Sequence, residues 1–216
     1  MDAAFVCRME AVLEVYRRVP EPSHPVVCVD EASVQRVKEV RAPIPAQPGH
    51  SERYDVEYER NGVAHLLAFH APFENWRRVD VADNYVAKQW AEGIRRLIQD
   101  DYPQAQRITL VMDNPNTHVG ASLYKAFQPA LARALLDKLE FVYTPKHGSR
   151  LDIAQCELSV LTRQCLDRRL PDIATVISEI AACTITRNQS KKPVDWHFTT
   201  DNARINLKCL YPKLSD

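Results

Sequence analysis

Two short apolar runs that each end in an aspartate constrain this sequence more than any other feature. Residues 26–29 lead into Asp30, and residues 108–112 lead into Asp113. Runs of this length, rich in Val, Ile and Leu, predict buried β-strands. A carboxylate at the end of a buried strand loses hydration, so it needs a cation or a hydrogen-bond donor as a partner. The two aspartates are therefore the first candidates for a functional site.

The rest of the chain alternates between helical and extended patterns. Apolar residues at helical spacing predict helices over residues 4–18, 83–100, 120–138, 151–168, 172–186 and 200–210. Extended segments are predicted over residues 54–60, 63–69, 76–81 and 139–143, after a proline-rich loop at 40–50. Asn61-Gly62 tolerates positive φ, and it predicts a tight hairpin between the first two of these segments. Strands followed by alternating helices and strands predict an α/β fold with a mixed sheet.

A parallel pairing of the two aspartate strands would bring their carboxyl ends together. With the hairpin strands on the far side of the first strand, the order of connection reverses there, and open α/β sheets bind ligands at such a reversal. Mg²⁺ prefers oxygen ligands, and paired metals support phosphodiester chemistry. Simpler roles also fit, because Asp113-Asn114-Pro115 has the composition of a turn and Asp30-Glu31 of a solvated strand end.

Composition excludes several classes of protein. The net charge of zero argues against strong nonspecific nucleic-acid binding by the chain as a whole. No apolar run approaches the ~20 residues that a membrane span needs, and no secretory signal begins the chain. The six cysteines lack C-x-x-C spacing, which disfavours a zinc ribbon or redox motif. We expect most of them to pack as small apolar side chains in a reducing cytoplasm.

Ordered motifs in this sequence resemble those of DDE transposases, in the insertion-sequence branch of the mariner superfamily. Residues 27–31 are similar to the first acidic motif, 110–118 to the second, and 143–149 to the loop before the third. The hairpin region and the helix of residues 157–169 extend the likeness to roughly residues 5–212. The resemblance implies a ribonuclease-H-like fold, with a five-stranded mixed sheet flanked by helices. It also implies metal-dependent cleavage and strand transfer of transposon DNA.

The resemblance implies that Asp30 and Asp113 are catalytic acids and ligands of Mg²⁺ or Mn²⁺, with two ions bound. The third acidic position departs from the family pattern, because Gln155 stands where the last Glu is usual. A neutral amide offers one carbonyl oxygen and should weaken a site for a hard cation. Asp152, three residues earlier where Asn is usual, either reaches the metal from the same helix face or caps the helix.

Other residues near these motifs are assigned lesser roles. Supporting roles are expected for Glu31, Asn114, His118 and His147. DNA contacts are expected from Lys146 and from Arg150, which stands where Trp is usual. The resemblance implies transposon ends and target DNA as partners and no membrane, and it leaves a homodimer open. The expected location is the cytoplasm, at the nucleoid when the chain is on DNA.

The predicted organisation is a linker helix over residues 1–24 and a ribonuclease-H-like endonuclease domain over residues 25–212, without helix-turn-helix domains. Two functions follow from the resemblance. The first is a transposase catalytic domain that Gln155 impairs. The second is an inactive remnant that keeps the fold, weak DNA contact or dimerisation. A ribonuclease-H-like nuclease acting on RNA is a third, weaker alternative.

Overall fold

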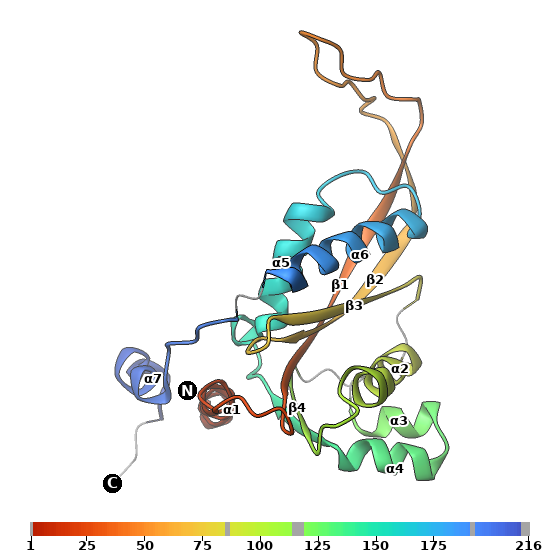
Figure 1. The fold of residues 1–216 in the computed structure, drawn as a ribbon. Coiled ribbons are helices and arrows are strands. Elements are labelled where there is room, and N and C mark those ends of the chain that lie inside the picture. The colour runs from red at the N-terminus through yellow and green to blue at the C-terminus, as the bar shows by residue number, and fades with distance from the viewer. Residues whose placement is uncertain (1, 85–86, 114–118, 191–192, 213–216) are drawn as a thin grey trace.

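The computed structural model describes residues 2–84, 87–113, 119–190 and 193–212. A five-stranded mixed sheet in the order β3-β2-β1-β4-β5 forms its centre (Figure 1). The strands are β1 Val26–Glu39, β2 Tyr58–Ala71, β3 Trp76–Ala82, β4 Ile108–Met112 and β5 Leu139–Tyr143. β2 is antiparallel to both β1 and β3, whereas β4 is parallel to both β1 and β5. The predicted α/β fold, the five-stranded mixed sheet and the reversal between β1 and β4 are confirmed.

Helices cover both faces of the sheet (Figure 1). The α-helices are α1 Ala3–Tyr16, α2 Ala87–Arg96, α3 Ala121–Ala126, α4 Pro129–Asp137, α5 Ile153–Cys165, α6 Ile173–Gln189 and α7 Thr200–Asn206. The π-helix η1 Leu97–Asp101 extends α2, and the 3-10 turns are η2 Ser149–Leu151 and η3 Lys208–Leu210. No helix in the described part of the chain is long and apolar enough to cross a membrane.

Strand alternation sends successive residues of β1 into two different cores. Val27 and Val29 are fully or almost fully buried with Trp90 and Ile94 of α2. Cys28 lies on the opposite face, in a core shared with Ile153 of α5 and with residues of α1. Because side chains alternate along a strand, Asp30 follows Cys28 onto the α5 face. The strand pattern therefore decides which helix meets the first aspartate.

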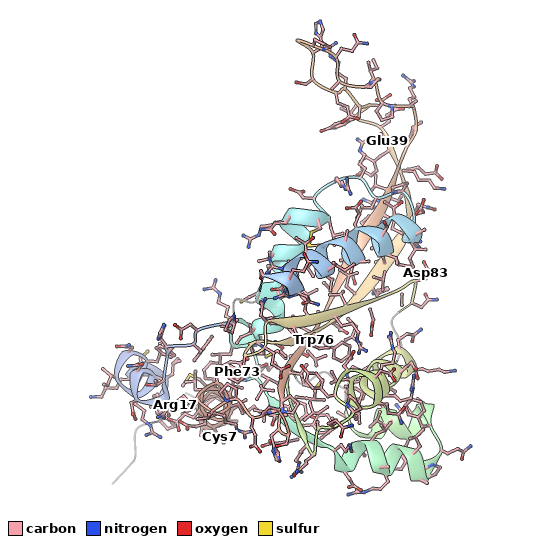
Figure 2. All side chains as sticks on the ribbon, viewed as in Figure 1. Cys7, Arg17, Glu39, Phe73, Trp76 and Asp83 are labelled. Atoms are coloured by element: carbon pink, nitrogen blue, oxygen red, sulfur yellow. A yellow bond between two sulfur atoms is a disulfide. The ribbon has the colours of Figure 1, made fainter. Side chains whose placement is uncertain are left out.

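The hairpin predicted at Asn61-Gly62 is wrong. β2 continues through these two residues, and together they form a β-bulge opposite Arg36 of β1, between the pairs Gln35–Val63 and Val37–Arg60. Gly62 has φ +82, a left-handed value that suits a bulge as well as a turn. The chain reverses instead through residues 40–57, in an arm that projects from the body beyond Glu39 (Figures 1 and 2).

Two predicted helices also have different bounds. Residues 120–138 form α3 and α4 rather than one helix, since Pro129 disfavours helical backbone at Gln128, whose ψ is 145°. The helix predicted over residues 83–100 is described from Ala87 and changes to π geometry at Leu97. The strand predicted to end at Asp30 continues to Glu39. Its pairing with β4 ends at Val29, but its pairing with β2 extends to Glu39 and keeps the chain extended.

Cysteine packing differs from the expectation. Of the four free cysteines only Cys28 is buried, and the exposed ones are Cys7, Cys156 and Cys209. Cys165 at the end of α5 and Cys183 in α6 form a disulfide, with their Cα atoms 6.6 Å apart. The sequence showed no paired spacing because the two partners are 18 residues apart and meet only through the packing of α5 on α6.

The bulge at Gly62 generates a stability prediction. An added Cβ at Gly62 would lie 2.6 Å from Nη2 of Arg36, whereas Gly49 has the same φ of +82 and nothing within 4 Å. Gly49→Ala should cost about 1 kcal/mol through backbone strain alone. Gly62→Ala should cost somewhat more, about 1.5–2 kcal/mol, because the Arg36 guanidinium must also move and its ion pair with Asp83 is disturbed. Urea denaturation of both variants measures the free energy of unfolding. Equal losses of this free energy would show that the Arg36 contact contributes nothing to the difference.

Candidate active site

The strand register places Asp30 and Asp113 at neighbouring positions. Val29 of β1 pairs with Met112 of β4 in a parallel ladder, and each aspartate is the next residue along its strand. Neighbouring strands lie about 4.8 Å apart. β4 ends at Met112, so Asp113 is exposed at the carboxyl edge of the sheet, while β1 continues past Asp30. The reversal in strand order lies between these two residues.

The Asp30 carboxylate is in an unfavourable environment for a negative charge. Its pKa is raised to about 6, first by burial and then by the nearby charges of Asp113 and Glu31. The backbone N–H of Glu31 donates to Oδ1 of Asp30 at 2.8 Å and partly offsets this rise. Two carboxylates in mutual range repel each other unless a proton or a cation lies between them. Asp30 and Asp113 therefore form an electrostatically coupled pair.

Asp152 is the N-cap of α5, as one of the two sequence alternatives predicted. Its Oδ1 accepts a hydrogen bond from the backbone N–H of Ala154 at 2.9 Å. The residue is only 2% exposed, and its Oδ2 finds no hydrogen-bond partner among the described residues. The pKa of Asp152 is raised well above its ordinary value by burial, by Asp30 and by Asp113. The cap is thus also a third carboxyl group within electrostatic range of the pair.

The surroundings of Asp152 explain its burial. Tyr16 of α1 donates from its hydroxyl to the carbonyl oxygen of Leu151 at 2.7 Å and contacts Cys28 Sγ at 3.4 Å. Burial is the main cause that raises the pKa of both Tyr16 and Cys28. The charge of Asp152 raises both pKa values further, and for Tyr16 the neighbouring Cys28 does so as well. Tyr16 and Cys28 were missed as neighbours of the site, because contacts between α1 and the start of α5 leave no local sequence signal.

A groove of about 830 Å³ runs from Asp30 along α5. Asp30, Glu31, Arg150 and Gln155 line its near end. Ser159 and Arg163 continue the lining at four-residue steps from Gln155, which places all three on one helix face. Arg163 was missed as a site residue, although this spacing on a predicted helix could have revealed it.

The remaining predicted site residues are more peripheral. Lys146 and His147 are exposed on the loop before η2, and His147 has a left-handed φ of 66°. Arg150 is exposed and Glu31 is exposed, and both border the groove. Asn114 and His118 lie outside the described residues. Of these predicted residues, the structure therefore brings Glu31 and Arg150 to the groove.

The donor atoms at this edge suit a hard divalent cation. Carboxylate oxygens of Asp30, Asp113 and Asp152 and the amide oxygen of Gln155 are the ligand type that Mg²⁺ and Mn²⁺ prefer. The orphaned, buried Oδ2 of Asp152 is an acceptor that a cation would satisfy. In the arrangement described, no three His, Cys, Asp or Glu side chains of the described residues are already close enough to hold an ion. The donor atoms therefore fit such a cation in chemical type.

The raised pKa values generate a pH prediction. Unfolded Asp ionises near pH ~4, so the folded state binds more protons than the unfolded state between that pH and about 6. The free energy of unfolding of the metal-free chain should therefore fall as the pH rises through this window. Asp152→Asn keeps a capping group and removes a buried charge. It should raise the free energy of unfolding at pH 7 by about 1–3 kcal/mol and flatten the pH dependence.

A matched control exists at the start of α1. Asp2 caps that helix through the N–H of Ala4, also at 2.9 Å, but it is exposed. Asp2→Asn should change the free energy of unfolding at pH 7 by less than about 0.5 kcal/mol. Thermal denaturation between pH 4 and 8 measures both variants. A destabilised Asp152→Asn variant at pH 7 would contradict the electrostatic description of the site.

Comparison with known proteins agrees with this geometry. Residues 25–177, more than half of the chain, match the model of the DDE superfamily endonuclease family. No curated protein matches the sequence. The structure aligns with the Mos1 mariner paired end complex with Mn at a TM-score of 0.53 and 14% identity, over 89% of this chain and 65% of that one. It aligns with the Mos1 strand transfer complex at a TM-score of 0.57 and 15% identity, over 84% and 53%.

These comparisons carry different weights. The chain spans less than two thirds of each Mos1 chain, and identities this low establish the fold alone. The family match is stronger, since it includes Asp30, Asp113, Asp152 and Gln155 in one continuous stretch. The chain belongs to the DDE superfamily endonucleases, and its fold is the ribonuclease-H-like fold of mariner-type transposases.

Proposed function

We propose that this chain is a transposase catalytic domain that cleaves and joins phosphodiester bonds of transposon DNA. The observation that carries the proposal is the parallel β1–β4 register, which sets Asp30 beside Asp113 at the switch point of the sheet. The endonuclease domain of the proposal spans residues 25–212. Action in the cytoplasm and as a homodimer are parts of the same proposal.

In this proposal the two strand-end aspartates hold a divalent cation, Mg²⁺ or Mn²⁺. Bound as a pair, such ions activate the attacking oxygen and stabilise the leaving oxygen of a phosphodiester. Asp30 and Asp113 supply the charge, and the raised pKa of Asp30 means that the cation must compete with a proton below about pH 6. Asp152 supplies a third carboxyl group from the start of α5.

Gln155 limits the site. Its side chain lines the groove beside Asp30, but the amide is neutral and offers one acceptor oxygen. Charge count is one of the main determinants of affinity for a hard cation. We therefore expect weak metal binding and low activity from the chain as it stands. The alternative function, an inactive remnant that retains the fold, is favoured by this same residue.

The groove along α5 supports DNA as the partner. Exposed Arg150 and Arg163 both line it, and guanidinium groups bind phosphate through paired hydrogen bonds. Lys146 is exposed on the preceding loop and adds a mobile point charge. Three basic side chains thus lie on this side of the site even though the chain has no net charge. One of the similar solved structures is a Mos1 strand transfer complex, which agrees with a DNA substrate.

The first prediction concerns the third acidic position. Gln155→Glu should tighten Mn²⁺ binding at least about tenfold, which corresponds to 1.4 kcal/mol, because it adds a charge to the ligand set. Calorimetric titration measures the affinity, and nicking of supercoiled plasmid with Mn²⁺ measures the activity. Asp30→Asn and Asp113→Asn in the same background are the controls and should abolish both signals. If the Gln155→Glu variant neither binds Mn²⁺ nor nicks DNA, the catalytic proposal is wrong, and the alternative of an inactive remnant is supported.

The second prediction concerns the groove. Arg163→Ala should weaken binding of a short DNA duplex several-fold and reduce the slope of log K against log salt by about 1, since one phosphate contact is lost. Arg133 is a suitable control, because it is exposed on α4 and forms a local ion pair with Asp137. Arg133→Ala should leave both the affinity and the slope unchanged. Equal effects of the two variants in fluorescence anisotropy would contradict a DNA path along α5.

A further inference from the structure

A buried ion cluster lies beneath α5, next to the candidate site but outside it. Glu157 of α5 is 6% exposed. Arg187 of α6 donates to both of its carboxylate oxygens, from Nε to Oε1 at 2.5 Å and from Nη2 to Oε2 at 2.8 Å. Nε of Arg77, a β3 residue that is 3% exposed, lies 2.9 Å from the same Oε1. One carboxylate of α5 is therefore held between two guanidinium groups from two other elements.

The guanidinium groups are themselves held in place. Arg77 donates from Nη2 to Oδ1 of Asn75 at 2.6 Å, and its backbone N–H and C=O both pair with the side-chain amide of Asn188 at 2.9 Å. Asn75, in the turn between β2 and β3, donates to the carbonyl oxygen of Arg187 at 3.2 Å. The cluster thus joins α6 to the start of β3, beside Trp76 in Figure 2.

Strand register relates the cluster to the acids. Cys28 of β1 pairs with His70 of β2, and His70 pairs with Arg77 of β3, so the three form one row across the sheet. Asp30 lies two residues beyond Cys28 and therefore on the same face. Asp152 influences Cys28 at one end of this row, while Glu157 meets Arg77 at the other end. Five residues of α5, about 7.5 Å of helix, separate the two contacts.

The charges of the cluster are not needed merely to pack α5. Leu158 and Leu161 of α5 already fill an apolar core with β2 and α6. Apolar contacts of this kind are non-directional, so they permit small rotations and shifts of a helix. A bidentate pair between a guanidinium and a carboxylate fixes both direction and distance. His70, whose pKa burial first lowers to about 4, is neutral beside the cluster at pH 7 and does not replace either arginine.

We propose that Glu157, clamped by Arg77 and Arg187, is a positioning residue that sets the rotation and height of α5 over the sheet. The clamp thereby holds Asp152 and Gln155, in the first turn of α5, at their place beside Asp30. The inference rests on the proposed function for its catalytic meaning, but the clamp itself is a property of the metal-free chain.

The test uses the Gln155→Glu background and two changes of the clamp. Glu157→Gln keeps the shape of the side chain and removes its negative charge. Arg187→Lys keeps the positive charge and removes the guanidinium group that binds both carboxylate oxygens. Leu170→Ala is the control, because Leu170 is fully buried in the same α5–α6 core and belongs to no ion pair of the described residues. Two quantities are measured well below the unfolding temperature: the affinity for Mn²⁺ alone, and hydrogen exchange of amides 153–157 in the metal-free chain.

Glu157→Gln should weaken Mn²⁺ binding at least about tenfold and Arg187→Lys about fivefold, with amide exchange in the first turn of α5 accelerated by similar factors. Leu170→Ala should lower the unfolding temperature yet leave both quantities within about twofold. If both clamp variants behave like Leu170→Ala, the inference is overturned while the proposed function stands. If Glu157→Gln does not fold, the comparison of Arg187→Lys with Leu170→Ala decides whether the inference holds.

Failure of the proposed function gives a different result. If the Gln155→Glu chain binds no Mn²⁺, the metal site is wrong, and exchange of amides 153–157 alone decides the inference. Faster exchange in Arg187→Lys than in Leu170→Ala would then support the clamp, and equal exchange would refute it.

Discussion

The parallel pairing of β1 with β4 is the constraint on which the rest of this structure depends. It joins two halves of the sheet that the chain builds in opposite directions, β1-β2-β3 and β4-β5. It also sets the ends of two apolar strands side by side, so that Asp30 and Asp113 share one edge. A slip of the register by one residue would turn Asp30 toward the core of α2. Asp30 itself opposes that slip, because its carboxylate would then be buried among apolar side chains.

The electrostatics of this edge differ from those of the remaining surface. Several ion pairs among the described residues join exposed arginines to acids three or four residues away and contribute little to stability. Asp30 and Asp152, by contrast, have raised pKa values because burial and like charge oppose their ionisation. Perturbed carboxyl groups that lie within electrostatic range of each other, one of them lining a groove, are typical of functional sites. In the metal-free chain this arrangement is destabilising at neutral pH, and a bound divalent cation would reverse that effect.

Sequence alone predicted the α/β architecture and the two aspartates that follow apolar strand segments, for identifiable physical reasons. An apolar strand segment followed by an aspartate is encoded within a few residues, and so is the Asp152 cap, whereas the true end of β1 at Glu39 depends on its pairing with β2. Asn61-Gly62 misled the prediction, because positive φ suits a bulge in a long ladder as well as a turn. Only the partner strand distinguishes the two cases. The single helix predicted over residues 120–138 failed at Pro129, where the local signal was present but was outweighed by apolar periodicity.

Long-range contacts could not be predicted in this way. Glu157 is an α5 residue whose side chain enters a cluster with Arg77 and Arg187 instead of the groove beside Asp30. Those arginines are distant in sequence and become its partners only when β3 and α6 pack against α5. The Cys165–Cys183 disulfide and the contact of Tyr16 with Cys28 have the same origin.

The central claim is that one divalent cation is held between Asp30, within β1, and Asp113, directly after β4. Anomalous diffraction from a crystal of the Gln155→Glu chain soaked in Mn²⁺ would test it most directly. The account predicts an anomalous peak between the carboxylates of Asp30 and Asp113, within about 2.0–2.3 Å of an oxygen of each. A well-ordered crystal in which these carboxylates turn apart and Mn²⁺ binds elsewhere, or nowhere, would contradict it.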